Sequence, residues 1–297
     1  MTTRAVGPLA GIGWLKSAVN LGRHNARALF GGAGLIMVMA LLPSAITFPL
    51  QLAMKPGPAM VGVIMLFSMV AGILMVPLIG GYLGMIDATE NERPAKASDV
   101  FAAYRSGGGA MRLIGFGLAM LGVYLVAALV IVGVAGTGIA TWYMQLVAQA
   151  GKVPPTAMQL PAGFGTAMAL GAVFALLFSG VYAIGFGQVA LAGRGIRGAL
   201  GDGFLGSLKN LLPMLVLLIV SLIGGFVVML AIALVVGLLA FLAKLVSVWL
   251  MLVVVVPLYI AIMISLYVVM FGVMYYMWRD VCSISAERPA PTTALTA

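Results

Sequence analysis

Residues 211–243 read LLPMLVLLIVSLIGGFVVMLAIALVVGLLAFLA and contain no charged side chain. After the single Lys244, a second uncharged stretch runs over residues 245–278. A helix rises about 1.5 Å per residue and needs about 20 apolar residues to cross the hydrocarbon core of a bilayer. Each stretch is therefore long enough for one membrane-spanning helix, and the two together predict a hairpin with Lys244 at its turn.

The same pattern extends over the rest of the chain. Charged residues divide it into six long neutral runs, and the Pro154-Pro155 pair lies in a loop because consecutive prolines cannot continue a helix. We expect one integral membrane domain over residues 1–282 and a disordered cytoplasmic tail over 283–297. The predicted fold is an all-α polytopic membrane helix bundle with six transmembrane helices, at roughly 29–50, 60–86, 113–143, 163–191, 211–242 and 246–278.

Composition excludes most other classes. Hydrophobic residues make up 63% of the 297 residues and charged residues only 8%, which no water-soluble monomer can bury. The net charge of +9 is gathered in a few short segments, so it does not indicate nucleic-acid binding. With Cys282 as the only cysteine, an internal disulfide framework is excluded.

The distribution of charge predicts the orientation in the membrane. On a six-helix path, Lys55, Lys152 and Lys244 are the only Lys or Arg residues on one side, and all seven acids lie on the other side with the remaining basic residues. Basic loops stay in the cytoplasm. The sequence therefore predicts a multi-pass protein of the bacterial cytoplasmic (inner) membrane with both termini cytoplasmic.

The chain also divides into three units of similar length, each a surface segment followed by a helical hairpin. Asp99-Val100-Phe101 and Asp202-Gly203-Phe204 begin the second and third units alike, and Trp14 takes the aromatic place in the first. A threefold parallel repeat is one interpretation, and chance similarity of short motifs is the other.

Residues 13–27 are predicted to form an amphipathic interfacial helix. Lys16, Arg23 and Arg27 share one stripe at 100° per residue, and Trp14 lies opposite them. Such a helix lies flat at the membrane surface with its cations toward lipid headgroups. It either caps the cytoplasmic ends of the bundle or recognises specific lipids.

Small residues inside the spans predict where helices approach one another. Gly80 and Gly84 form one small-xxx-small face, and Gly171, Ala175 and Ser179 form another. We expect these faces to pack within the chain, with a homo-oligomer interface as the alternative.

Chemistry-bearing residues are scarce. No predicted span contains an ionisable side chain unless Lys244 is buried along a pathway instead of lying in a tight outer turn. Gln188 and Tyr182 are polar groups at depth, either bonded between helices or lining a polar cavity. With one His, one Cys and no recognised catalytic or nucleotide motif, no catalytic, cofactor or metal residue is assigned, and the chain is predicted not to be an enzyme.

Several short motifs resemble those of a known family. They are Gly13-Trp14-Leu15-Lys16, Phe30, Pro77-Leu78-Ile79-Gly80-Gly81 and Asp99-Val100-Phe101-Ala102-Ala103-Tyr104-Arg105. In these the chain resembles uncharacterised six-span bacterial inner-membrane proteins, similar to the membrane domain that precedes some glycerophosphodiester phosphodiesterases. The resemblance implies a six-span membrane domain and carries no established activity or functional residues.

Two functions remain open from the sequence. The first is a non-enzymatic membrane protein that organises membrane lipids or partner proteins, because packing and headgroup-facing features are plentiful while chemistry-bearing groups are few. The alternative is an uncoupled permease or channel for a small or amphipathic solute, with Gln188, Tyr182 and Lys244 as pathway residues.

Overall fold

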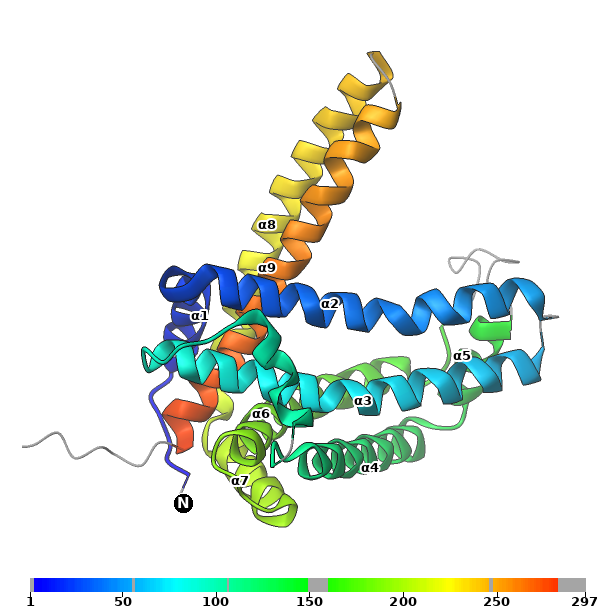
Figure 1. Cartoon of the computed structure of the whole chain (residues 1–297). Helices are drawn as coiled ribbons and strands as arrows, with labels where there is room; N and C mark the ends of the chain where they lie inside the picture. The colour runs from blue at the N-terminus through cyan, green and yellow to red at the C-terminus, as the bar shows by residue number, and fades with distance from the viewer. Residues whose placement is uncertain (1–2, 55–56, 106, 149–159, 246–247, 283–297) are drawn as a thin grey trace, which may run out of the picture.

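The structure, a computed structural model, describes residues 3–54, 57–105, 107–148, 160–245 and 248–282. Its regular elements are all helices within these ranges (Figure 1). In chain order they are α1 (Ala10–Asn20), α2 (Gly22–Ala53), α3 (Pro58–Glu90), η1 (Ala97–Tyr104), α4 (Ala110–Ala135), α5 (Gly138–Ala148), α6 (Phe164–Ala190), α7 (Ile196–Lys209), α8 (Leu211–Leu245) and α9 (Val248–Cys282).

Six of these helices are long and apolar enough to cross a membrane: α2, α3, α4, α6, α8 and α9. The prediction of an all-helical, six-span integral membrane protein is therefore confirmed. The spans form three hairpins, α2 with α3, α4 with α6, and α8 with α9, which meet at one end of the molecule (Figure 1). Away from that end the α8–α9 hairpin points in a different direction from the other two.

The third span is shorter than predicted. Residues 113–143 were expected to form one helix, but α4 ends at Ala135 and the separate helix α5 begins at Gly138. Gly136 between them has a φ of 94°, a backbone conformation that ends a helix and that only glycine adopts without strain. Lys55, Lys152 and the tail 283–297 lie outside the described residues.

The predicted surface helix over 13–27 is also divided. Helix α1 ends at Asn20, and α2 begins at Gly22 with a break at Asn25, whose φ is −152°. The Asn25 side chain accepts a hydrogen bond from the Ala28 N–H at 3.1 Å and donates one to the Ala95 carbonyl at 3.2 Å. Asn25 thus acts as an N-cap for the first span. Because of this break, Lys16 on α1 and Arg27 on α2 do not lie on one continuous helix.

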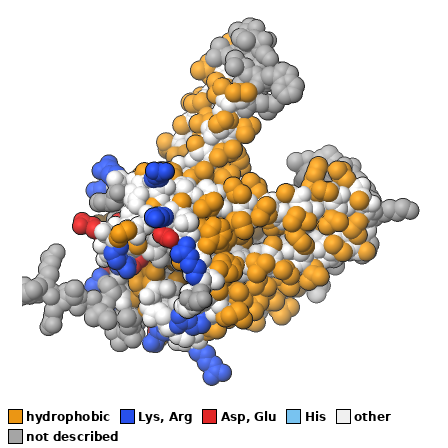
Figure 2. All heavy atoms as spheres, viewed as in Figure 1, with side chains coloured by type: hydrophobic (Ala, Val, Ile, Leu, Met, Phe, Trp, Pro, Cys, Tyr) orange, Lys and Arg blue, Asp and Glu red, His pale blue; other side chains and the backbone are white. Residues whose placement is uncertain are grey.

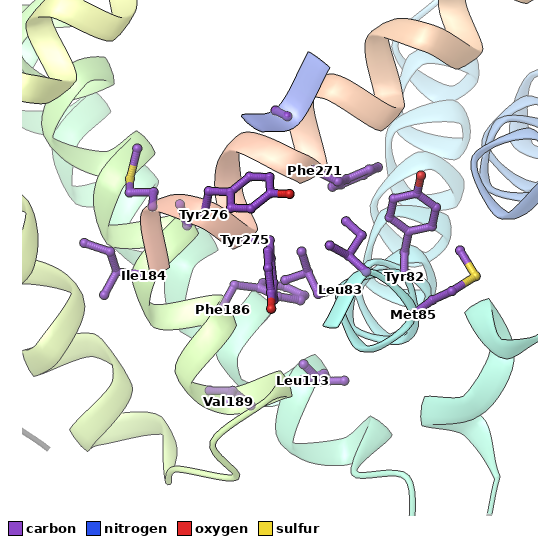
Figure 3. Close-up of a cluster of buried hydrophobic side chains, with 14 of the residues drawn as sticks. Tyr82, Leu83, Met85, Leu113, Ile184, Phe186, Val189, Phe271, Tyr275 and Tyr276 are labelled. Atoms are coloured by element: carbon purple, nitrogen blue, oxygen red, sulfur yellow. The ribbon is translucent and has the colours of Figure 1, made fainter. Parts of the chain in front are cut away.

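Burial is concentrated at the end where the hairpins meet. We call this region the hub: α1, η1, α7 and the adjoining ends of the six spans. The largest fully buried side chains lie in it, among them Tyr82, Phe186 and Tyr275 (Figure 3). Phe116 of α4 is also fully buried. Charged side chains gather on the hub, while the rest of the visible surface is mainly hydrophobic (Figure 2).

The outer parts of the hairpins, which we call the arms, bury little. The most apolar windows of α3 and α8 contain no buried residue. Along α8, the side chains of Leu222, Phe226 and Leu234 are each more than 60% exposed. Such surfaces suit lipid acyl chains, which are as apolar as the side chains themselves.

The helices of the hub pack in a cyclic order. Helix α1 contacts α8 and α9, η1 contacts α2 and α3, and α7 contacts α6 and α4, so each surface helix packs on the preceding hairpin. The first helix of each hairpin follows the same rule: α4 contacts α3, α8 contacts α6, and α2 closes the ring on α9. Three equivalent units would be expected to show this pattern of helix contacts.

Candidate functional site: the hub and its two pockets

Glycines on α3, α6 and α9 allow the surface helices to approach closely. The contacts join Gly81 to Val100 of η1, Gly185 to Ala199 of α7, and Gly272 to Ala18 of α1. At the tightest of them, a Cβ on Gly81 would lie only 2.0 Å from the Val100 carbonyl oxygen. Each hairpin therefore contributes one glycine to the contact with a surface helix, although Ala199 and Ala18 do not correspond to Val100 in the Asp99-Val100-Phe101 motif.

A hydroxyl adds to the η1 contact. Tyr104 at the end of η1 donates to the Leu74 carbonyl of α3. A tyrosine hydroxyl is protonated at neutral pH at its ordinary pKa, and desolvation raises the pKa of this one further, so it is a donor there.

The segment before α1 links the first unit to the third. Asn210, fully buried between α7 and α8, accepts a hydrogen bond from the Val6 N–H at 2.8 Å and donates to the Arg4 carbonyl at 2.9 Å. The Arg4 N–H in turn donates to the Val281 carbonyl of α9 at 3.0 Å. Asn210 thereby holds the N-terminal segment against the hub.

Most acidic side chains of the hub are paired with arginines. The part of the chain that the structure describes contains five ion pairs: Arg4–Asp280 at 2.5 Å, Arg194–Asp202 at 2.5 Å, Arg279–Glu90 at 3.0 Å, Arg105–Asp99 at 3.7 Å, and Arg93–Asp87. Partly exposed pairs contribute only about 0–1 kcal/mol each. Basic residues outnumber acidic ones, 16 to 7. After these pairs form, the remaining basic side chains can therefore interact with headgroups or solvent.

The predicted headgroup residues separate into two kinds. Lys16, Arg23 and Arg27 are exposed and form no ion pair within the described part of the chain. Trp14, expected to face lipid, is instead 3% exposed, and its indole N–H donates to Asp280 Oδ2 at 3.1 Å. It turns inward because the close contact of α1 with α9 covers this face of the helix.

The two predicted packing faces also differ. Gly80 packs against the side chain of Leu113 on α4, and Gly84 lines a pocket beside it. Ala175 and Ser179 are exposed, and a Cβ on Gly171 would meet no described atom within 4 Å. The second face of small residues thus packs against no other helix in the described chain.

The three predicted pathway residues are not brought together. Gln188 is fully buried in the hub, and the ring of Tyr182 lies 6.4 Å from Phe116 and 5.2 Å from Phe186 between centroids. Lys244 lies beside the end of α8, with α9 starting at Val248, which agrees with a turn at the tip of the arm. Its side chain is outside the described residues.

Gln188 has an unusual environment. Neither amide atom of its side chain has a hydrogen-bond partner among the described residues, although the thiol of Cys282 lies beside it. An unpaired buried polar group costs about 1–3 kcal/mol. Gln188 thus has two unpaired buried atoms, and Ser207 and Trp278 have one each, among the described residues.

One pocket lies between α3, η1 and α4. Its volume is about 270 Å³, and apart from Met85, Asp99 and Leu113 its lining consists of glycines and alanines, including Gly80, Gly84 and Ala102. Asp99 is engaged by the Lys96 N–H at 2.9 Å and by Arg105. The free surface of this pocket is therefore mostly backbone and methyl groups.

A second pocket lies between α1 and α9, with a volume of about 350 Å³. Its polar lining comes from two arginines, one acid, two hydroxyls and an indole: Arg4, Arg279, Asp280, Ser17, Tyr276 and Trp14. The guanidinium carbon of Arg279 lies 4.7 Å from the centroid of the Tyr276 ring, which fixes its plane by a cation–π contact.

Sequence reasoning did not find Arg4, Arg279, Asp280 or Asn210 as parts of a site. No local pattern marks them, because each acts on a partner far away in the chain. Within the described residues, no three His, Cys, Asp or Glu side chains come together as metal ligands would.

Comparison with known proteins adds no relative. No protein-family model, no curated protein and no solved structure matches the chain. The resemblance to membrane domains that precede glycerophosphodiester phosphodiesterases therefore stays an expectation.

Proposed function

We propose that this chain is a non-enzymatic protein of the bacterial cytoplasmic membrane that organises lipids or partner proteins around its arms. Both termini and the hub lie on the cytoplasmic side in this proposal, because basic segments stay there. The observation that carries it is the contrast in burial: the spans pack tightly only at the hub, and the arms expose apolar side chains.

The α8–α9 arm points away from the other two (Figure 1), and the visible surface of the arms is mainly hydrophobic (Figure 2), which suits contact with lipid or with another membrane helix. The hub supplies the second requirement for an organiser, a rigid base with exposed basic side chains at the membrane surface. Lys16, Arg23 and Arg27 are such side chains.

A second candidate is the uncoupled permease or channel for a small or amphipathic solute. The buried, unpaired amide of Gln188 is the observation in its favour, since a passing polar solute would satisfy that amide. Neither of the two pockets includes Gln188 or Tyr182 in its lining.

Extraction of the tagged chain from bacterial membranes in polymer nanodiscs distinguishes the two candidates. An organiser should retain an enriched class of lipid or a stoichiometric partner, and the combined change of Lys16, Arg23 and Arg27 to Gln should reduce enrichment of anionic lipid. Bulk lipid composition without a partner, together with solute flux in proteoliposomes that Gln188→Leu abolishes, would establish the permease instead.

A further inference from the structure

The pocket between α1 and α9 has the polar groups that bind a phosphate ester. Arg4 donates hydrogen bonds from Nε to the Asp280 carbonyl and from one Nη to the Asp280 carboxylate. Arg279 donates one from an Nη to the Glu90 carboxylate. A guanidinium carries five N–H donors, so both arginines keep donors for a ligand. Arginine binds phosphate oxygens in bidentate geometry more specifically than lysine does.

The two guanidiniums of the lining are each paired with one acid, Arg4 with Asp280 and Arg279 with Glu90. The unliganded site is therefore neutral, and attraction for a phosphodiester, which carries a single negative charge, comes from the remaining N–H donors of the two guanidiniums. The Asp280 carboxylate already accepts hydrogen bonds from Arg4 and Trp14 and has lone pairs left to accept one from a hydroxyl group of the same ligand. The Ser17 hydroxyl can donate or accept one.

The position of the pocket points to a lipid as the source of that phosphodiester. Trp14 of α1 and Tyr276 of α9, residue types that prefer the headgroup layer, both line the pocket. On the outer side of α1, Ile12 and Val19 are exposed beside Lys16. Apolar side chains exposed next to a cation suit the boundary between headgroups and acyl chains.

We propose that the pocket lined by Arg4, Trp14, Ser17, Tyr276, Arg279 and Asp280 binds the headgroup of an anionic phospholipid, phosphatidylglycerol in chemical class, through its phosphodiester. The site deepens the proposed function, because it names the lipid class that the hub holds. It also places the lipid between the first and third units, where α1 packs on α9 and closes the ring.

Gly13 offers a way to fill the pocket without breaking its ion pairs. It lines the pocket, and a Cβ added there would meet no described atom within 4 Å. Gly13→Leu should therefore occupy the site of the headgroup and leave the fold intact. Gly201→Leu is the matched control, since Gly201 lies on the surface helix α7, outside this pocket, and has equally open space.

The experiment titrates the purified full chain with short-chain phosphatidylglycerol and follows binding by native mass spectrometry. Inorganic phosphate and short-chain phosphatidylcholine are the comparison probes. We expect phosphatidylglycerol to bind more tightly than either probe, Gly13→Leu to weaken its binding by about tenfold, and Gly201→Leu to leave it unchanged. Melting temperatures of both variants should match that of the parent chain.

Equal binding of phosphatidylglycerol by Gly13→Leu and the parent chain would overturn the proposed site, while lipid enrichment in nanodiscs would still support the organising function. Binding of inorganic phosphate as tight as that of the lipid would overturn the assignment to a phospholipid. A Gly13→Leu chain that melts early is replaced by Arg4→Gln. This change removes one guanidinium from the lining and leaves the Asp280 charge without its cation, so it should weaken binding of phosphatidylglycerol but not of phosphatidylcholine.

Discussion

The hub and the arms use the same apolar composition in different ways. In the hub, glycine contacts such as Gly81 with Val100 and aromatic side chains such as Phe116 and Phe186 interlock. In the arms, side chains such as Leu222 and Phe226 face outward without a partner helix. The difference shows that hydropathy determines where the chain enters the membrane, while shape and close packing determine which helices meet.

The largest expected difference between the two regions is in the cost of truncating a leucine. Leu83 is fully buried in the hub, and Leu222 is exposed on the α8 arm. Leu83→Ala should lower the free energy of unfolding by about 2–5 kcal/mol because it leaves a cavity, whereas Leu222→Ala should change it by less than about 0.5 kcal/mol. Unfolding followed by tryptophan fluorescence in mild detergent measures both, and similar losses at the two sites would contradict the distinction.

A glycine pair on α3 repeats the comparison within a single helix. Gly81→Ala forces a Cβ into the Val100 carbonyl oxygen and should lower stability by about 1–3 kcal/mol. Gly62→Ala lies on the arm with open space around it and should stabilise the helix slightly. Thermal unfolding of both variants is the measurement, and a neutral Gly81→Ala would show that η1 does not pack as described.

Asn210 tests the link between the N-terminal segment and the hub. Asn210→Ala removes the acceptor of the Val6 N–H and the donor to the Arg4 carbonyl, which should cost about 1–3 kcal/mol. Hydrogen exchange should rise at Val6, and it should not rise when Asn20, which is half-buried and bonds to the Lys16 carbonyl of its own helix, is changed to Ala. Unchanged exchange at Val6 in the Asn210 variant would refute the link.

The smallest effect is expected at Gln188. Because its amide is unpaired among the described residues, replacing it by Leu, of similar size, should leave stability unchanged or raise it slightly. Thermal unfolding compares the variant with the parent chain. A clear loss of stability would mean that Gln188 has partners beyond those described, which would favour its role as a polar site.

The arms could be predicted from the sequence, and the hub could not. Long neutral runs such as 211–243 define the spans without reference to any other part of the chain. Trp14 shows why the hub is different: its inward orientation depends on Asp280, which lies 266 residues away. The predicted continuous helix over residues 13–27 is also wrong, because the Asn25 side chain accepts a hydrogen bond from the Ala28 N–H and caps the span instead.

Small-residue spacing illustrates the same limit for the candidate site. Gly80 packs against Leu113, while a Cβ on Gly171, which has the same kind of spacing, would meet no described atom within 4 Å. The spacing allows close approach but does not select the partner, since lipid-facing and packed faces have the same apolar composition. Arg4 and Asp280 become a site only when α1 lies against α9.

The most direct test of the contrast between hub and arms is photolabelling of the unmodified chain in bilayers that contain a phospholipid with a diazirine on its acyl chain. Mass spectrometry then maps the residues that react. The structure predicts insertion along the arms, at Leu222, Phe226 and Phe48, and none at Tyr82 or Phe186. Insertion at Tyr82 and Phe186 with protection of Leu222 would contradict the account.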